Sequence, residues 1–127
     1  MEKLGLKATV FGAIICAASP VLAQGDPTQG KREFRSCRSC HQLAEGRNSA
    51  GPSLYGMFGA TAGQVEGFRY SDAMTASGIV WDEETVDAFI TNPEEYLEGT
   101  TMAFRGLANP QKRADLIAYL MQETAAE

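Results

Sequence analysis

The stretch RSCRSCHQL, residues Arg35 to Leu43, contains Cys37, Cys40 and the chain's one histidine, His41. Side chains at i, i+3 and i+4 of a helical turn share one face, so both thiols can reach the vinyl groups on one edge of a haem. The imidazole then rises beneath the iron, where it must be neutral to coordinate. The C-x-x-C-H pattern therefore predicts one haem c, attached covalently through Cys37 and Cys40.

Three other uses of these side chains compete with haem attachment. A thioredoxin-like dithiol belongs to a βαβ context, and the chain shows no strand-like alternation. Structural zinc normally takes four Cys or His ligands, whereas the chain after residue 23 offers three. A disulfide between Cys37 and Cys40 would close a small, strained loop and would leave His41 without a role. Haem attachment is the interpretation that uses all three side chains.

The first 23 residues have the features of a secretory signal peptide. Lys3 and Lys7 give a positive start, a short apolar run follows, and residues 21–23 (VLA) provide the ending that precedes a cleavage site. We predict cleavage after Ala23, one domain at residues 24–127, and export to the bacterial periplasm. An uncleaved anchor is the alternative, although the apolar run is shorter than the about 20 residues of a membrane-spanning helix.

The charge of the predicted domain is acidic and uneven. Cleavage leaves 104 residues (127 − 23) with nine basic and fifteen acidic side chains, a formal charge of −6, which disfavours nucleic-acid binding. Residues 31–47 carry a local excess of +3, whereas residues 82–98 carry seven acidic side chains and no basic one. The resulting dipole can orient encounters with a charged partner. The competing interpretation is a pair of ordinary solvated helix faces.

Apolar spacing and capping residues predict an all-α domain with long loops. The expected helical segments lie at residues 26–34, 71–77, 82–91, 93–97 and from 109 onward. Pro27 and Pro110 stand at first helical positions, where the missing N–H costs nothing, and Asn92-Pro93 ends the third segment. Residues 44–69 are rich in glycine and small side chains, and so long an irregular stretch in a compact domain usually wraps something.

The group on the other side of the iron decides what the haem does. Since there is no second histidine, the candidates are the methionines after residue 23, which are Met57, Met74, Met102 and Met121. Three of them stand in expected helices or between apolar neighbours, where core packing is the ordinary role of methionine. Met102 instead stands in a loop, and we predict it as the second axial ligand opposite His41.

With these residues placed, the chain resembles the class I c-type cytochromes, above all the mitochondrial-type branch and its α-proteobacterial, purple-bacterial relatives. The resemblance extends over residues 30–123, and its landmarks are the pair Gly30 and Phe34 and the stretches Cys37–His41, Gly51–Gly56, Gly67–Ala73, Gly78–Trp81, Asn92–Pro93, Gly99–Phe104 and Asp115–Leu120. It implies a cytochrome c domain at 24–127 with a small all-α fold of four or five short helices wrapped around one haem. The first and last helices would cross where Gly30 allows close approach.

The resemblance also implies roles for residues around the haem. The backbone carbonyl of Pro52 would accept the N–H of His41 and fix the ring. Tyr70 and Trp81 would hydrogen-bond a haem propionate, and Phe104 would shield the iron–sulfur bond from water. The alternative for the three aromatic residues is an ordinary place in the core.

The function implied by the resemblance is that of a soluble periplasmic carrier, which is not an enzyme. It would move one electron at a time between soluble or membrane-bound redox proteins of a respiratory or photosynthetic chain. We expect a monomer without stable membrane insertion, and the acidic segment favours partners with a basic docking face. The alternatives are a haem protein that binds or senses a small ligand, and a haem subunit of a larger oxidoreductase.

Several positions depart from the family pattern. Ala60 stands where the mitochondrial branch has an arginine near a propionate. In the loop that contains Met102, Thr101 replaces a lysine and Glu98 replaces a proline, and the loss of the proline favours easier opening of that loop. Glu94 and Glu95 occupy part of the region where the mitochondrial protein carries docking lysines. A docking mode like that of the mitochondrial protein is therefore not expected.

Overall fold

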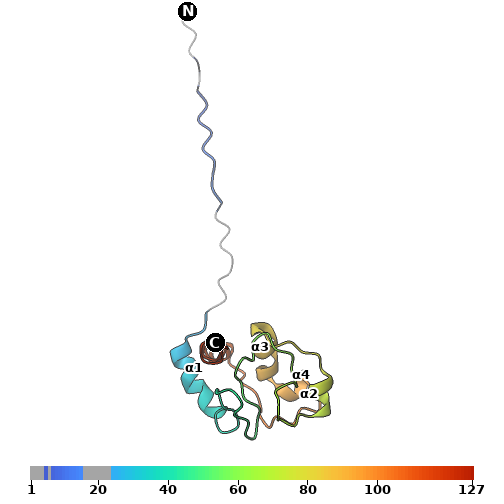
Figure 1. The fold of residues 1–127 in the computed structure, drawn as a ribbon. Coiled ribbons are helices and arrows are strands. Elements are labelled where there is room, and N and C mark those ends of the chain that lie inside the picture. Colours follow the sequence, from blue (N-terminus) through green and yellow to red (C-terminus); the bar gives the residue numbers. More distant parts are fainter. Residues whose placement is uncertain (1–4, 6, 16–23) are drawn as a thin grey trace, which may run out of the picture.

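The computed structural model describes Gly5, residues 7–15 and residues 24–127. The other N-terminal residues, which include the predicted cleavage position at Ala23, lie outside the described residues (Figure 1). The large apolar side chains between residues 10 and 15 are 88–93% exposed, so they are not part of the core of the domain. Among the described residues, no helix is both long and apolar enough to cross a membrane.

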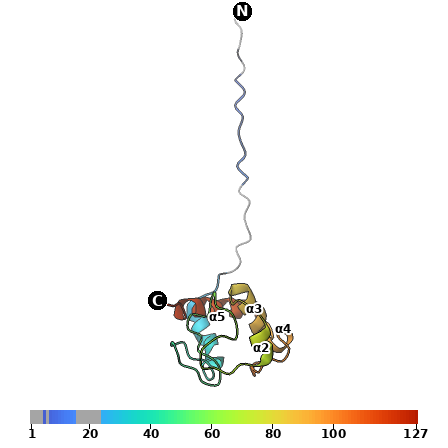
Figure 2. The same cartoon turned by 45° about the vertical axis from the view of Figure 1, so that its right-hand side comes forward.

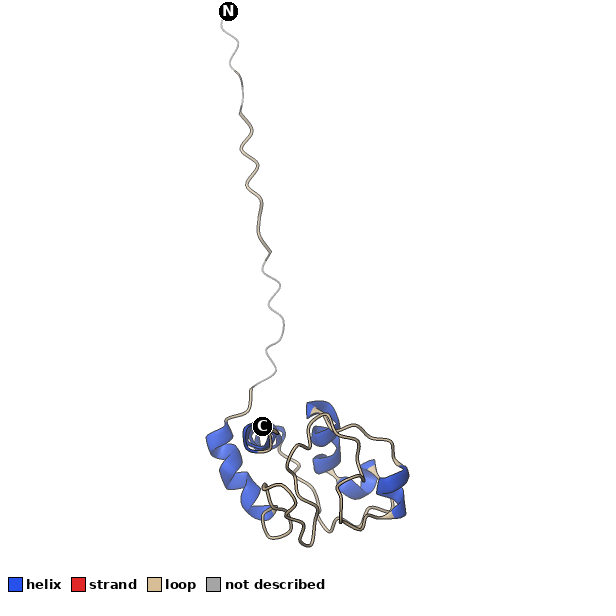
Figure 3. Cartoon of the chain, in the orientation of Figure 1, coloured by secondary structure: helices blue, strands red, loops and turns tan. Residues whose placement is uncertain are grey.

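Short helices joined by long loops make up the domain (Figure 3). The helices are α1 (Pro27–Glu33), α2 (Asp72–Ala76), α3 (Glu83–Thr91), α4 (Pro93–Tyr96) and α5 (Pro110–Glu123), and a 3-10 turn η1 (Phe34–Ser36) follows α1. The described part of the chain contains no β-strand, and one isolated bridge joins Thr61 to Val80. The predicted all-α class is confirmed, and each expected helical segment contains a helix.

Each of these α-helices begins at a side chain that caps its first turn. The caps Asp26, Ser71, Asp82, Asn92 and Asn109 each accept a hydrogen bond from a backbone N–H two or three residues further on. Such a bond satisfies a donor that the start of a helix leaves free, and it is worth about 1 kcal/mol. Because these bonds are local in sequence, the helix starts could be predicted without knowledge of the tertiary structure.

The crossing of α1 and α5 brings the two ends of the domain together (Figures 1 and 2). Gly30 is buried there, and a Cβ on it would overlap the carbonyl oxygen of Asp115. The rings of Phe34 and Tyr119 pack with their centroids 5.6 Å apart. The buried carboxylate of Asp115 also accepts the N–H of Asp26 at 2.8 Å, which ties the start of α1 to α5. The expected crossing at Gly30 is confirmed.

The apolar core lies between these helices and continues into the loops. Its fully buried members are Phe34, Val86, Phe89, Ile90, Leu116, Ile117 and Leu120. Side chains that are only half-buried pack around it, and those from α2 and the loops are Leu43, Leu54, Met57, Phe58, Met74, Trp81, Leu97, Met102 and Leu107. Helices and loops therefore share one apolar interior, and the loops supply its less completely buried side.

The long segment at residues 44–69 is held by hydrogen bonds from side chains to backbone. The side chain of Asn48 accepts the N–H of Ser53 and donates to the carbonyl of Glu66, both at 2.9 Å, so it joins the two arms of the segment. The buried hydroxyl of Ser53 donates to the carbonyl of Ala44 at 2.6 Å. The N–H of Gly56 donates to the carbonyl of a residue just beyond α5. This irregular segment is thus fixed by hydrogen bonds within itself and by one bond to the chain that follows α5.

Candidate functional site

The two cysteines and the histidine lie on one tight turn that directly follows η1. The N–H groups of Cys40 and His41 both donate to the carbonyl of Cys37, at 3.1 and 2.9 Å, and the N–H of Cys37 donates to the carbonyl of Phe34 at 2.9 Å. The bond from His41 back to Cys37 spans four residues, as in an α-helix. The structure therefore brings the three side chains together on a single helical turn.

Cys37 and Cys40 are free thiols, so the disulfide considered from the sequence is not formed. Cys37 is half-buried and packs against the core, whereas Cys40 is exposed. Burial raises the pKa of the Cys37 thiol above its ordinary value, and the hydroxyl of Ser36 partly offsets this effect. Both sulfur atoms are available for covalent attachment to a cofactor.

The imidazole ring of His41 is held from two sides. Its Nδ1 lies 2.8 Å from the carbonyl oxygen of Pro52, and because a carbonyl can only accept, Nδ1 is the nitrogen that carries the proton. Gly51 is buried against the ring, and a Cβ on it would lie 2.5 Å from Cε1 and 2.7 Å from Nδ1. With Nδ1 protonated, Nε2 is left to bind a metal, which is the tautomer that a metal-binding histidine needs.

Met102 lies in the loop between α4 and α5 and packs half-buried against the core. Its carbonyl accepts the N–H of Phe104 at 2.9 Å, which makes a tight turn at this point of the loop. Met57 and Met74 also pack half-buried against the core, as their predicted packing role requires. Met121 differs from its expected packing role, because it is 41% exposed on α5.

Tyr70, Trp81 and Phe104 are half-buried and come from three separate segments. The hydroxyl oxygen of Tyr70 accepts the N–H of Val65 at 3.0 Å, which leaves its own proton free to donate. Burial raises the pKa of Tyr70, so the hydroxyl keeps that proton. The ring of Trp81 packs against Phe89 with centroids 5.2 Å apart. These placements allow the donor roles implied by the resemblance, and for Trp81 they also match the aromatic-core alternative.

The residues around this turn fit a haem. The donor set combines an imidazole of fixed orientation, two thiols three residues apart that are not paired with each other, and a thioether on a separate loop. A flat apolar group that covers the half-buried apolar side chains of the loops stabilises the folded protein by about 25 cal/mol for each Å² of apolar surface removed from water. Within the described residues, no three His, Cys, Asp or Glu side chains are placed to share a bare metal ion.

An all-α domain with an oriented histidine on a C-x-x-C-H turn defines a c-type haem protein. The sequence profile of the cytochrome c family matches residues 27–124, which contain every residue of the site described above. The chain belongs to the cytochrome c family. Its cofactor is therefore haem c, attached through Cys37 and Cys40, and the single attachment motif makes it a single-haem electron carrier.

Similar proteins come from purple bacteria and from eukaryotes. The chain is 42% identical over 116 residues to cytochrome c2 of Rhodomicrobium vannielii, which covers 91% of this chain and 93% of the relative. It is 43% identical over 123 residues to cytochrome c2 of Blastochloris viridis, with coverage of 94% and 96%. It is 45% identical over 103 residues to cytochrome c of Stellaria longipes, with coverage of 80% and 95%.

A solved structure shows the same fold. Cytochrome cH from Methylobacterium extorquens matches this chain with a TM-score of 0.73 and 37% sequence identity, covering 77% of this chain and 99% of that one. The small class I cytochrome fold expected from the sequence is therefore confirmed.

Three residues that hold the site or the loops around it were not assigned a role from the sequence. Gly51 is a landmark of the resemblance, yet its contact with the His41 ring becomes visible only in the structure. Ser53 is buried in a loop, where its hydroxyl binds a backbone carbonyl, and nothing in the sequence distinguishes it from an exposed serine. Arg113 stands on the last helix among other polar residues, and only its tertiary contacts single it out. A signal for Gly51 does exist in hindsight: a Gly-Pro pair ten residues after the histidine.

We predict that Gly51→Ala lowers the free energy of unfolding of the haem-loaded protein by about 1–3 kcal/mol, as overpacking of a tight interior does. The cause is space, because the φ of Gly51 is not in the left-handed region and the added Cβ meets the ring of His41. Guanidinium unfolding followed by haem absorbance measures the effect. The control, Ala50→Ser, adds an atom on the exposed neighbour and should stay within about 0.5 kcal/mol. Equal unfolding free energies for the two variants would show that the ring has room to move.

Proposed function

We propose that His41 and Met102 are the two axial ligands and that the chain carries electrons as an exported, freely diffusing protein. The observation that carries the proposal is the fixed tautomer of His41, with Nδ1 on the carbonyl of Pro52 and Nε2 free on the turn that bears both thiols. Burial does not separate the candidates, since Met57, Met74 and Met102 all pack half-buried against the core. Met102 is favoured by its place in the long loop before α5, whereas Met74 is on α2 and Met121 is exposed on α5.

Haem c supplies a one-electron ferric/ferrous couple, and the protein tunes and protects it. The ring of His41 is fixed in orientation, because Nδ1 is bonded to the carbonyl of Pro52 and Gly51 lies close beside the ring. The thioether of Met102 is a soft, neutral ligand that favours the reduced state. Half-buried apolar side chains from the loops exclude water, which penalises the additional positive charge of the ferric state. Together these features favour a high potential and little rearrangement on electron transfer.

A haem protein that binds or senses a small ligand is the second candidate, and one observation favours it. Two hydrogen bonds of the segment that precedes Met102 are long: the N–H of Gly99 to the carboxylate of Glu94 and the N–H of Met102 to the hydroxyl of Thr100, both at 3.4 Å. Glu98 and Thr101 in the same segment are exposed. A loop anchored in this way opens more easily than one held by buried bonds. The variant Met102→Ala distinguishes the two functions.

Substitution of Met102 by alanine tests the proposed ligand. We expect the midpoint potential to fall by about 0.1–0.4 V, a part of the about 0.8 V range that axial ligands span. The variant should also bind imidazole or cyanide rapidly, whereas the parent resists both. A redox titration followed by visible spectroscopy gives both results, and Met121→Ala is the matched control on an exposed methionine. If Met102→Ala keeps the potential and the ferric charge-transfer band of the parent, Met102 is not the ligand.

The N-terminal segment is proposed as a cleaved export signal that directs the protein to the periplasm. Its apolar side chains between residues 10 and 15 are exposed rather than packed in the core. The matches to the two cytochromes c2 cover 91% and 94% of this chain, more than the 104 of 127 residues that follow Ala23, so they extend into the N-terminal segment. Gel filtration of a membrane-free periplasmic extract distinguishes a free monomeric carrier from a haem subunit of a larger oxidoreductase.

For the export signal, we expect the protein purified from the periplasm of an expressing bacterium to have the mass of residues 24–127 plus one haem. Replacing Ala23 by a large residue, as in Ala23→Phe, should block processing, because signal peptidases require a small residue at this position. Intact-mass spectrometry reads both results. A full-length chain recovered from the membrane fraction would support the uncleaved anchor instead.

The docking surface is proposed to lie on the acidic segment of α3 and α4. Its exposed carboxylates are Asp82, Glu83, Glu84, Glu94, Glu95 and Glu98. The seventh, Asp87, is paired with Arg113 and contributes less to the outward field. Exposed acidic side chains attract a positively charged redox partner over roughly one Debye length, about 10 Å at 0.1 M salt.

We expect the rate of electron transfer to a basic redox protein to fall as ionic strength rises. The double variant Glu84→Gln, Glu95→Gln should slow this reaction by about 2–10-fold at low salt and have little effect at high salt. Glutamine at position 95 keeps an oxygen that can accept from the side-chain amide of Asn92, and the capping bond from the backbone N–H of residue 95 to Asn92 Oδ1 is unaffected, so the helix start is preserved. Glu123→Gln, at the far end of α5, is the control. A faster low-salt reaction with an acidic partner protein would contradict the proposed surface.

A further inference from the structure

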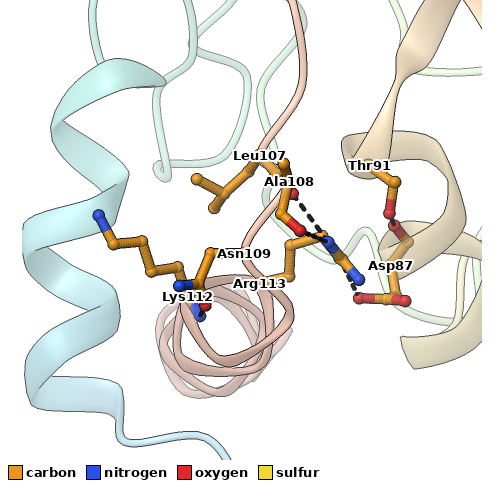
Figure 4. Close-up of polar contacts among 7 residues, drawn as sticks. All are labelled: Asp87, Thr91, Leu107, Ala108, Asn109, Lys112 and Arg113. Atoms are coloured by element: carbon orange, nitrogen blue, oxygen red, sulfur yellow. Dashed lines mark hydrogen bonds and ion pairs between the residues drawn. The ribbon is translucent and has the colours of Figure 1, made fainter.

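Arg113 on α5 joins three parts of the fold through one nearly buried guanidinium (Figure 4). Its side chain is 12% exposed, and its Nε donates to the carboxylate of Asp87 on α3 at 2.7 Å. Its Nη1 donates to the backbone carbonyls of Leu107 and Ala108, both at 2.9 Å. Charge-assisted bonds of this kind are about twice as strong as neutral ones. The loop that contains Met102 is thereby tied to two helices at its C-terminal end.

The same end of the loop is also pressed against α3. The N–H of Leu107 donates to the carbonyl of Ile90 at 2.8 Å. A Cβ on Gly106 would overlap the carbonyl oxygen of Thr91, so the two backbones are in direct contact there. Gly106 has a φ of +107°, a conformation that favours glycine. Backbone contact and the Arg113 bonds thus converge on residues 106–108.

The end of the loop that precedes Met102 is held differently. The N–H of Thr100 donates to the carbonyl of Leu97 at 3.1 Å, and the N–H of Met102 reaches the hydroxyl of Thr100 at 3.4 Å. Both bonds are local and the second is long, and they join the loop only to itself and to the end of α4. The long-range hydrogen bonds of this loop therefore come from the residues that follow Met102. Leu107, the first carbonyl partner of Arg113, is five positions after it.

We propose that Arg113 is the positioning residue for Met102: it holds the loop closed and thereby limits exchange of the methionine for another ligand. This inference rests on the proposed ligation by Met102. Arginine suits the task because its planar fork reaches two carbonyls and a carboxylate at once, whereas lysine is a single point charge. Asp87 orients the fork, and Arg113 in turn neutralises one carboxylate of the acidic segment.

The test uses the ferric, haem-loaded protein and two measurements. The first is the affinity for imidazole, read from the visible spectrum, and the second is the hydrogen-exchange rate of the Leu107 N–H, whose acceptor is the carbonyl of Ile90. Arg113→Gln should raise the imidazole affinity about tenfold, which is the effect of losing one net charge-assisted bond, and should speed exchange at Leu107 by a similar factor. Arg113→Lys keeps the charge and should raise both by about threefold or more.

Matched controls separate positioning from general effects. Lys112→Gln removes a positive charge from the adjacent position of α5. The lysine side chain extends toward α1 (Figure 4), where its Nζ lies 3.9 Å from the carboxylate of Glu33. Ile117→Val shortens a buried side chain of the same helix and removes none of the bonds to the loop. Both controls should leave the imidazole affinity within about twofold of the parent, since neither touches the bonds that hold residues 106–108.

The outcomes are distinguishable. If Arg113→Gln matches Lys112→Gln while Met102→Ala binds imidazole strongly, the ligand assignment stands and the role of Arg113 is refuted. If Ile117→Val raises the affinity as much as Arg113→Gln, general destabilisation explains the effect and the proposal is overturned. If Met102→Ala itself leaves the affinity unchanged, the ligand assignment fails and the positioning role fails with it. Should Arg113→Gln not assemble with haem, Arg113→Lys and the exchange rate at Leu107 carry the test.

Discussion

The close contact between α1 and α5 at Gly30 fixes where the rest of the site can lie. Because η1 and the Cys37–His41 turn follow α1 without interruption, this contact sets the place of the histidine against the core. The loop with Met102 leads directly into α5, so the same helix pair also anchors the opposite side. A Cβ at position 30 would overlap the backbone of α5, and the spacing is therefore set by main-chain contact instead of by adaptable side chains.

Side chains that bind backbone groups complete this arrangement. Much of the domain is irregular chain, whose N–H and C=O groups lack the partners that helices and sheets provide. Asn48 and Ser53 supply such partners in the first long loop, and Arg113 supplies them in the second. At Pro52 the roles are reversed: a backbone carbonyl accepts a hydrogen bond from the side chain of His41 and thereby orients it. Loops held in this way move little when charge changes nearby, which suits a carrier of electrons.

The parts that the sequence predicts well depend on local information. The haem motif, the capping side chains such as Asp82 and Asn109, and the glycine at the helix crossing each act within a few residues or through a known pattern. The parts that could not be predicted depend on contacts between distant segments. Asp87 and Arg113 are 26 positions apart, so the acidic segment seemed to carry one more unpaired charge than the structure allows.

The burial of Asp115 and the limited space at Gly51 also depend on contacts between distant segments, so they could not be predicted either. A carboxylate in a helix ordinarily faces water, and here it is buried because the N–H of Asp26 and the amide of Gln111 satisfy it. Gly51 is a glycine for lack of room beside His41, which composition cannot reveal. The two axial-ligand assignments remain predictions, since they came from residue types and loop position.

Gly106 also sets where the loop with Met102 tolerates changes in length. Its positive φ and its backbone contact with α3 leave no slack between that residue and α5, so an insertion or deletion there would shift the register of the last helix against α3. Glu98 and Gly99 are exposed, and the bonds around them are local and long. Residues added at that point can bulge into solvent. Loop grafts and length variants of this cytochrome are therefore best placed on the side that precedes the methionine.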